Sequence, residues 1–431
     1  MFPAVLRQNA NYRRLWIAQV ISEMGDWFNQ VAVFTLALRF TGSPLAIVFV
    51  LIAQTVPSTV IGPIAGVILD RVSRKRALII SDLVRAVVAL GPILVTSRER
   101  VWWLYALTAL LASASPFFTA GRLALIPSLA EPGEILAANS ITQGTHWTTL
   151  SIGSALAGLI IGPLGFRNAF LLNTVSFLGS AFFISRIAGV VETHRRSGQA
   201  AGAMRRPWRE YSEGLRYIRS EPMVLALLLI GLGWATGGGA MQVLFSVFGD
   251  LVFHRGAFGI GILYGAAGLG LASSAALANW LGKRLAFRTY KRVITFCYLS
   301  YGAFYVAFSQ VHRFWVAVLL IGLSRYFIGT SSVLNLTRLM QCIPDQYRGR
   351  VFSTNETITL TTMLVSMLVA GLATTAFGPR PVALAAGVLS GSTGLWWALA
   401  NWRGKLREPA VYAIELPHMV PEQESELAGG A

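Results

Sequence analysis

The sequence predicts an all-α polytopic membrane protein whose twelve transmembrane helices form two six-helix pseudo-repeats. Three observations favour this fold: the composition, a series of long apolar runs, and a motif that occurs once in each half of the chain. The 431 residues are 54% hydrophobic and 13% charged, whereas soluble domains carry about 25% charged residues. A transmembrane β-barrel requires strands of alternating polarity, and these runs do not alternate.

The apolar runs are long enough to cross a bilayer as helices, in which every backbone group satisfies its own hydrogen bonds. We expect the spans near residues 15–39, 45–69, 77–97, 101–127, 138–163, 167–190, 222–250, 258–281, 291–310, 313–340, 351–377 and 380–402. The chain then divides into an N-terminal six-helix bundle (1–190), a cytoplasmic linker (191–221), a C-terminal six-helix bundle (222–407) and a disordered cytoplasmic tail (408–431). The second part of the linker predicts an amphipathic surface helix.

The distribution of positive charge predicts the orientation of the spans. With the N-terminus inside, 24 of the 36 Lys and Arg residues fall in inside connectors and seven in outside connectors, and the other five lie within helices or at their ends. Both termini are therefore expected in the cytoplasm. The formal net charge of +17 is explained by this bias, so we expect no nucleic acid partner. The N-terminus shows no signal-peptide pattern.

A repeated motif relates the two halves. "GRLALIPSLAEPGEILAANSIT" closes the fourth span, and "TRLMQCIPDQYRGRVFSTNETIT" closes the tenth. Arg122 to Asn139 and Arg338 to Asn355 have the same spacing, and a proline lies within each interval. Two repeated halves are the architecture of many secondary transporters, in which the substrate site lies between the repeats.

The connector between the second and third spans carries the motif that is most specific. Gly66, Asp70, Arg71, Arg74 and Lys75 resemble the signature G-x-x-x-D-R-x-G-R-R/K of the major facilitator superfamily, with Ser73 in place of its second glycine. "LANWLGKR", between spans eight and nine, is similar to a decayed copy. "SDLVRA", "ILAANS" and "PDQYRGRVFS" resemble the branch of macrolide-efflux proteins, enterobactin-type siderophore exporters and lysophospholipid transporters.

The resemblance implies a cytoplasmic gate. Asp70 would accept hydrogen bonds from the start of the eleventh span, where the helix dipole favours an acid, and Arg74 would pair with Asp70. These contacts would close the cytoplasmic side. For Lys75 the alternative is a role in topology alone. Asp82 and Arg85 share a face of the third span near its cytoplasmic end, where we expect them to bond each other and to adjoin the gate.

Ionisable groups inside a span are costly and indicate function by default. Glu23 and Asp26 lie three residues apart on one face of the first span. We expect Asp26, and secondarily Glu23, to couple transport to protons or substrate; the alternative is a structural pair neutralised by a neighbouring arginine. Arg122 stands where many drug–proton antiporters of the superfamily carry a coupling arginine. His146 is expected to be structural.

Aromatic and cationic residues suggest a substrate cavity between the halves. Candidates are Trp27, Trp147 and Trp234, with Arg325 as a contact for an anionic substrate; the aromatic residues could instead face lipid. The fifth span keeps Gly153 and Gly158 of the antiporter pattern but has Ser154 where a proline is expected. Small residues at these positions let helices approach closely.

These observations predict a secondary transporter that exports an amphipathic small molecule (a drug, macrolide-like compound or siderophore) by proton-coupled alternating access. The alternative is a lysophospholipid or other lipid transporter that is not driven by protons. The sequence has no H-E-x-x-H, G-x-S-x-G or Walker motif, so we expect no enzyme, cofactor or metal. The expected partners are the substrate, protons and membrane lipid, and the chain is expected as a monomer in a bacterial cytoplasmic membrane.

Overall fold

The computed structural model describes residues 4–131, 133–188, 207–282, 284–406 and 408, and these residues form helices without a β-strand. The first half of the chain contains α1 (Ala4–Gln8), α2 (Ala10–Thr41), α3 (Pro44–Leu69), α4 (Arg74–Val88), α5 (Val101–Leu129) and α6 (Ile135–Ser185). The second half contains α8 (Pro207–Ser220), α9 (Pro222–Val247), α10 (Gly256–Gly282), α11 (Phe287–Gln310), α12 (Phe314–Cys342), α13 (Asp345–Phe377) and α14 (Pro379–Trp402). Short helices η1 (Gly91–Leu94), η2 (Arg98–Arg100) and η3 (Phe248–Val252) extend α4, α5 and α9.

The described helices account for the twelve expected spans. Nine stretches among the described residues are long and apolar enough to cross a membrane. One of them lies in α6, whose 51 residues would extend about 77 Å as a straight helix, more than twice the thickness of a hydrocarbon core; it therefore holds two spans. The more polar α2 and α11 have 32 and 24 residues and are also long enough. The all-α fold is confirmed, and the helix lengths leave room for the twelve predicted spans.

Two glycines at corresponding points of the two halves have the same backbone conformation. Gly165, between the fifth and sixth spans, has φ 78° and ψ 167°. Gly378, between the eleventh and twelfth spans, has φ 82° and ψ 167°. A side chain would be strained at this positive φ, which glycine adopts readily. The turn that reverses the chain between the last two spans is thus built in the same way in each half.

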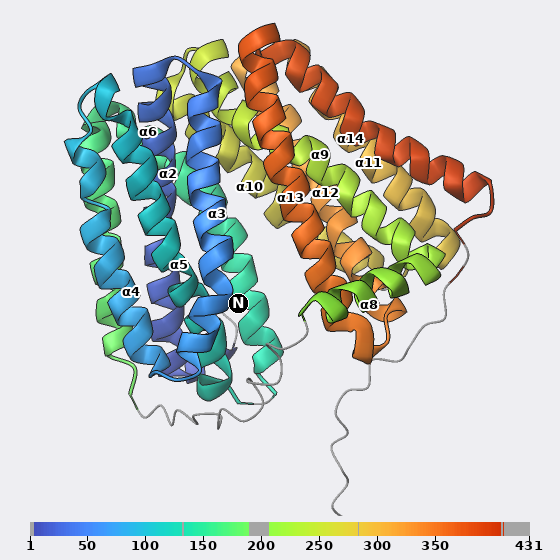
Figure 1. Ribbon diagram of the computed structural model, residues 1–431, viewed down its shortest axis with the longest axis horizontal. Helices are drawn as coiled ribbons and strands as arrows, with labels where there is room; N and C mark the ends of the chain where they lie inside the picture. The colour runs from blue at the N-terminus through green and yellow to red at the C-terminus, as the bar shows by residue number, and fades with distance from the viewer. Residues whose placement is uncertain (1–3, 132, 189–206, 283, 407, 409–431) are drawn as a thin grey trace, which may run out of the picture.

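The two halves form separate bundles that lie side by side, with α2 to α6 in one and α9 to α14 in the other (Figure 1). The linker helix α8 lies against the second bundle, at the start of α13. Arg350 Nη1 is 2.7 Å from Glu213 Oε2, the rings of Tyr217 and Tyr347 stack at 4.6 Å, and Ile218 is buried. The amphipathic helix expected in the linker is therefore present, and its apolar side packs on protein. The tail 409–431 lies outside the described residues.

The contact between the halves is concentrated on α6 and α10. Ser151 Oγ donates a hydrogen bond to the Gly265 carbonyl oxygen at 2.9 Å. A Cβ atom built on Gly158 would lie 2.9 Å from the Ala257 carbonyl oxygen, and one on Gly261 would lie 2.3 Å from the Ser154 carbonyl oxygen. These residues belong to the end of α6 before Gly165 and to the start of α10, which is the predicted external side.

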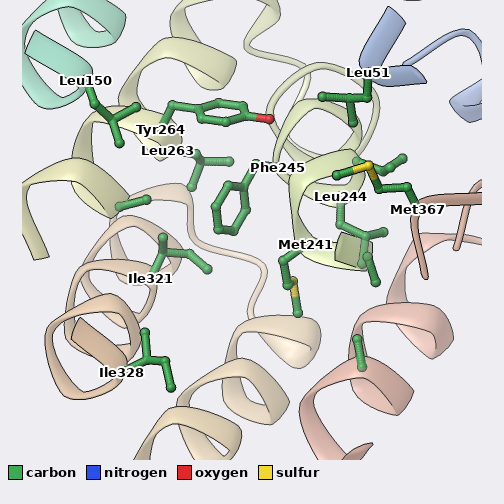
Figure 2. Packing of buried hydrophobic residues seen from close by; sticks show 14 of the residues in the cluster. Leu51, Leu150, Met241, Leu244, Phe245, Leu263, Tyr264, Ile321, Ile328 and Met367 are labelled. Carbon is green, nitrogen blue, oxygen red and sulfur yellow. The ribbon is translucent and has the colours of Figure 1, made fainter. Parts of the chain in front are cut away.

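A second contact joins the halves through α3 and α13 on the same side. A Cβ atom on Gly371 would lie 2.3 Å from Val48 Cγ2. Between these contacts lies a buried apolar cluster to which both halves contribute: Leu51 and Leu150 from the first, Phe245 and Tyr264 from the second (Figure 2). The halves are therefore sealed against each other toward the predicted external side.

Ser154 replaces the proline of the antiporter pattern without opening the helix. Its hydroxyl donates to the Leu150 carbonyl oxygen within α6, and its own carbonyl oxygen faces Gly261. Gly153 lies against Trp27 of α2, and Gly158 against the backbone of α10. The small residues thus serve the close approach that was predicted for them, one within the half and one across the halves.

Enlarging Gly261 should open the external contact. In Gly261→Leu the new side chain collides with α6 backbone, and such overpacking costs about 1–3 kcal/mol, which corresponds to a roughly 5- to 150-fold shift in population. Spin labels on Arg98→Cys and Arg313→Cys, both exposed on the predicted external side, should report longer distances by double electron–electron resonance.

Gly62→Leu is the matched control, because nothing lies within 4 Å of a Cβ atom on that glycine of α3. Its distance distribution should equal that of the parent. A folded Gly261→Leu protein with the parental distribution would contradict the assignment of this contact as the external seal.

Candidate functional site

Glu23 is the centre of a polar network that joins α2, α5 and α6. Arg122 Nη1 lies 2.8 Å from Glu23 Oε1, which also accepts a hydrogen bond from Gln19 Nε2 at 2.9 Å. Thr149 Oγ1 donates to Glu23 Oε2 at 2.6 Å, and His146 Nδ1 lies 3.6 Å from the same oxygen. The Glu23 side chain is 13% exposed. Both of its oxygens are therefore engaged by neighbouring helices.

Asp26 belongs to a second network, which joins α2 to α4. Arg85 forms a short ion pair with Asp82, and its Nη1 lies 3.9 Å from Asp26 Oδ2. The guanidinium lies over the rings of Phe118 and Phe177, at 4.5 and 4.4 Å. Arg85 is 2% exposed and Asp82 0%, whereas Asp26 is 42% exposed. Of the three acids in the two networks, Asp26 therefore has the longest ion-pair distance and the largest exposed fraction of its side chain.

Two features position the acids of α2 against the neighbouring helices: their spacing along the helix and a close contact at a glycine. Glu23 and Asp26 lie on one face of α2, since residues three apart are neighbours on a helix. A Cβ atom on Gly25, between them, would lie 1.9 Å from Ser176 Oγ of α6. The absence of a side chain at Gly25 lets α2 approach α6 closely. Asp82 and Arg85, three residues apart on α4, meet by the same spacing.

The depth of Asp82 and Arg85 differs from the prediction. They were expected near the cytoplasmic end of the third span as part of the gate. The span begins at Arg74 and runs to Leu94, so Asp82 and Arg85 lie near its middle and contact Asp26. Their mutual bond is present, and through Arg85 they join the network of Asp26; a role at the gate stays a prediction.

A cavity of about 430 Å³ opens beside the two networks, between α2, α3, α5 and α6. Its lining is largely polar and consists of Glu23, Asp26, Trp27, Asn29, Gln30, Gln54, Ser58, Thr108, Leu111, Ala112, Ser115 and His146. Asn29 is 5% exposed, and its Oδ1 atom is buried without a hydrogen-bond partner among the described residues. Such a volume suits a small solute or part of a larger one.

The networks do not balance in charge. The three carboxylates of Glu23, Asp26 and Asp82 share the two guanidiniums of Arg85 and Arg122. With all three acids ionised and His146 neutral, one negative charge is in excess. Asp26 is held at the longest distance and is the most exposed, so the excess charge resides there, at the wall of the cavity.

Three of the four predicted cavity residues lie elsewhere. Trp27 lines the cavity, but Trp147 packs beside His146 at a ring distance of 5.1 Å, and Trp234 packs on the apolar core in α9. Arg325, 6% exposed, lies in the second half over the rings of Phe245 and Tyr305. The polar cavity lies inside the first half, and a substrate cavity between the halves stays a prediction.

The polar wall of the cavity was not predicted from the sequence. Gln54 and Ser58 of α3 are four residues apart, and Thr108 and Ser115 of α5 are seven apart. Polar residues at these spacings share one face of a helix. That periodicity within two otherwise apolar spans is the signal that could have found them.

Comparison with known proteins now identifies the family. A sequence profile of the Major Facilitator Superfamily matches residues 15–360. The chain belongs to the Major Facilitator Superfamily. Among solved structures, a bacterial homologue of the iron transporter ferroportin in its inward-facing state is similar at a TM-score of 0.68 and 19% identity, over 92% of this chain and 100% of that one. A mutant of the nucleoside transporter NupG gives 0.67 and 12%, over 90% and 99%. These likenesses show the superfamily fold.

Relatives in the superfamily include exporters. The putative bacilysin exporter BacE of Bacillus subtilis is 26% identical over 84% of this chain and 88% of its own. Macrolide efflux protein A of Streptococcus pyogenes is 24% identical over 50% and 53%. The uncharacterized transporter YfiS of Bacillus subtilis is 27% identical over 52% and 53%; the match thus spans about half of the length of these last two relatives.

The superfamily motif between α3 and α4 is in an open arrangement. Asp70 lies exposed at the end of α3, and its carboxylate forms no ion pair with the described residues. Arg74 Nη1 instead donates to the Ala124 carbonyl oxygen of α5 at 2.9 Å. No described atom lies within 4 Å of a Cβ atom built on Gly66. The latch between Asp70 and α13 is not formed here and stays a prediction for the other conformation.

Ser73 and Lys75 have local structural roles in this motif. The Ser73 hydroxyl caps α4 by accepting a hydrogen bond from the Arg76 N–H, which a glycine could not do. Lys75 Nζ donates to the carbonyl oxygens of Ser185 and Ile187 at 2.8 and 2.6 Å. Lys75 therefore neutralises the negative end of α6 in addition to any effect on topology.

Removing the charge of Glu23 should destabilise the protein more than removing the charge of Asp26. Glu23→Gln leaves the buried Arg122 guanidinium uncompensated and should lower the free energy of unfolding by about 3 kcal/mol. Asp26→Asn should cost less than about 1 kcal/mol, because the Asp26 side chain is half-buried at a distance of 3.9 Å from Arg85, which keeps its ion pair with Asp82. Thermal unfolding of the purified protein in detergent should therefore show a lower Tm for Glu23→Gln only. Equal losses would refute the distinction.

Arg85 and Asp82 should behave as a coupled pair. Arg85→Met leaves the fully buried Asp82 carboxylate unpaired, at a cost of about 3–5 kcal/mol. Adding Asp82→Asn should recover more than half of this loss, as measured by the Tm of the single and double variants. The exposed Arg98→Met serves as the control and should leave the Tm unchanged. Strictly additive losses for Arg85→Met and Asp82→Asn would show that the two residues do not interact.

Proposed function

We propose that this superfamily transporter exports an amphipathic small molecule with a basic group out of the cytoplasm, in exchange for protons. The observation that carries the proposal is the excess negative charge at Asp26, on the wall of a polar cavity of about 430 Å³. In a medium of low dielectric, an unbalanced carboxylate favours a proton or a cationic ligand. The proton and the cationic ligand neutralise the same carboxylate, so binding of either displaces the other.

The contacts between the halves support a cytoplasmic entrance for the substrate. The α6–α10 and α3–α13 contacts seal the predicted external side, and the Asp70 carboxylate forms no ion pair with described residues on the predicted cytoplasmic side. Substrate would then reach Asp26 from the cytoplasm. Rocking of the halves would expose the site externally, where a proton would replace the substrate and permit return.

His146 gives the proton a second place to bind. Its Nδ1 atom lies 3.6 Å from Glu23 Oε2, and its ring is 46% exposed at the cavity wall. A proton on either Asp26 or His146 restores neutrality to the networks. The export direction is further supported by the relatives that are named as bacilysin and macrolide exporters.

Asp26→Asn should abolish gradient-driven export while leaving the protein folded. Cells that express the parent, Asp26→Asn or no transporter would be compared by untargeted mass spectrometry of the spent medium, each with and without a protonophore. The parent should enrich at least one basic amphipathic solute, and both the protonophore and the substitution should remove this enrichment. Protein levels in the membrane should be equal.

Asn29→Asp, which adds an acid at the same cavity wall, provides a second variant that should change which solutes are exported. Enrichment by Asp26→Asn equal to that by the parent would refute the role of Asp26. A change confined to lysolipids and indifferent to the protonophore would refute proton-coupled export and favour lipid transport.

A further inference from the structure

A groove between α3, α4 and α5 runs from the predicted cytoplasmic end of α4 toward its middle and shares no lining residue with the cavity described above. It encloses about 810 Å³. Its apolar wall includes Val72, Ile80 and Val84, which are 42%, 60% and 43% exposed. Exposed apolar side chains on a membrane-spanning helix face lipid. The groove therefore opens to the bilayer and not to the interior of either half.

The four cations between the end of α3 and the first turn of α4 divide into two pairs. Arg74 and Lys75 turn inward and donate to backbone carbonyl oxygens of α5 and of the end of α6. Arg71 and Arg76 are exposed and line the groove. Neither of these two guanidiniums forms a hydrogen bond or ion pair in the part of the chain that the structure describes. Their charge is available to a ligand from outside the protein.

Charge and apolar surface are continuous along one face of α4. Arg76, Ile80 and Val84 are spaced by four residues and line the same groove, so they follow one another over about 12 Å. Phe117 of α5 adds apolar surface on the other side. A ligand that fits this surface has a negative group at the cytoplasmic level and a hydrocarbon chain that runs into the membrane.

We propose that the groove binds one anionic glycerophospholipid of the cytoplasmic leaflet, with its phosphate between Arg71 and Arg76 and an acyl chain along α4. Basic pockets at the cytoplasmic ends of membrane helices suit such head groups. Arginine matches phosphate geometry through paired N–H donors. This site is distinct from the transport cavity and does not depend on the substrate proposed above.

The test uses native mass spectrometry of the purified full chain in detergent with an equimolar mixture of dioleoylphosphatidylglycerol and dioleoylphosphatidylcholine. The parent should retain phosphatidylglycerol in preference. Arg71→Gln/Arg76→Gln should weaken its retention roughly 25-fold, at about fivefold for each arginine. Arg288→Gln is the matched control, since Arg288 is an exposed arginine of the corresponding connector in the second half, and it should retain the lipid like the parent.

A second variant tests the apolar part separately. Ile80→Trp fills the groove and leaves both arginines in place, so it should also release the lipid. Equal retention of the two lipids by the parent, or retention of phosphatidylglycerol by the double arginine variant, would overturn the proposal. Full displacement of the lipid by millimolar inorganic phosphate would show a simple anion site and would also overturn it. A parent-like Tm for the variants confirms that they are folded.

Discussion

One buried guanidinium, that of Arg85, must serve two carboxylates, and the arrangement of the first half depends on it. A charge taken out of water costs several kcal/mol unless it is paired with good geometry. Asp82 is fully buried and takes the short contact, so Asp26 is left at 3.9 Å with much of its side chain exposed. The burial of one acid thus makes the other available to a ligand or a proton.

The charged networks use buried ion pairs, whereas the contact between the halves uses small residues and backbone. Asp26, Arg85 and Glu23 lie entirely within the first half, where Gly25 fixes α2 against α6. At its closest points the α6–α10 contact is made by small residues, mainly glycine, serine and alanine, with backbone against backbone. A rigid-body movement can therefore break and re-form the contact between the halves without separating a buried ion pair, which would cost far more.

The sequence predicted the spans and the shared helix face of Glu23 and Asp26, but not the polar cavity beside them. Apolar length and positive connectors predict spans directly, and the spacing of Glu23 and Asp26 puts them on one face. Periodicity does not say which neighbouring helix that face meets. Asp82 and Arg85 were therefore placed too near the membrane surface, and the packing of Arg325 against Phe245 and Tyr305 could not be foreseen. Single aromatic residues carry still less information, because core, lipid and cavity all accept them.

The ion pair at the predicted cytoplasmic side is exposed and weak, as expected of a contact that breaks during transport. Alternating access requires two conformations that differ by only a few kcal/mol. In this conformation the start of α13 is held by the Glu213–Arg350 pair, whose side chains are 31% and 36% exposed, and exposed pairs contribute about 0–1 kcal/mol. Asp70, exposed at the end of α3, offers an alternative acid to the same helix start. Because each partner binds weakly, the occupation of Asp26 that we propose would need to supply only a small free energy to shift the balance between the two conformations.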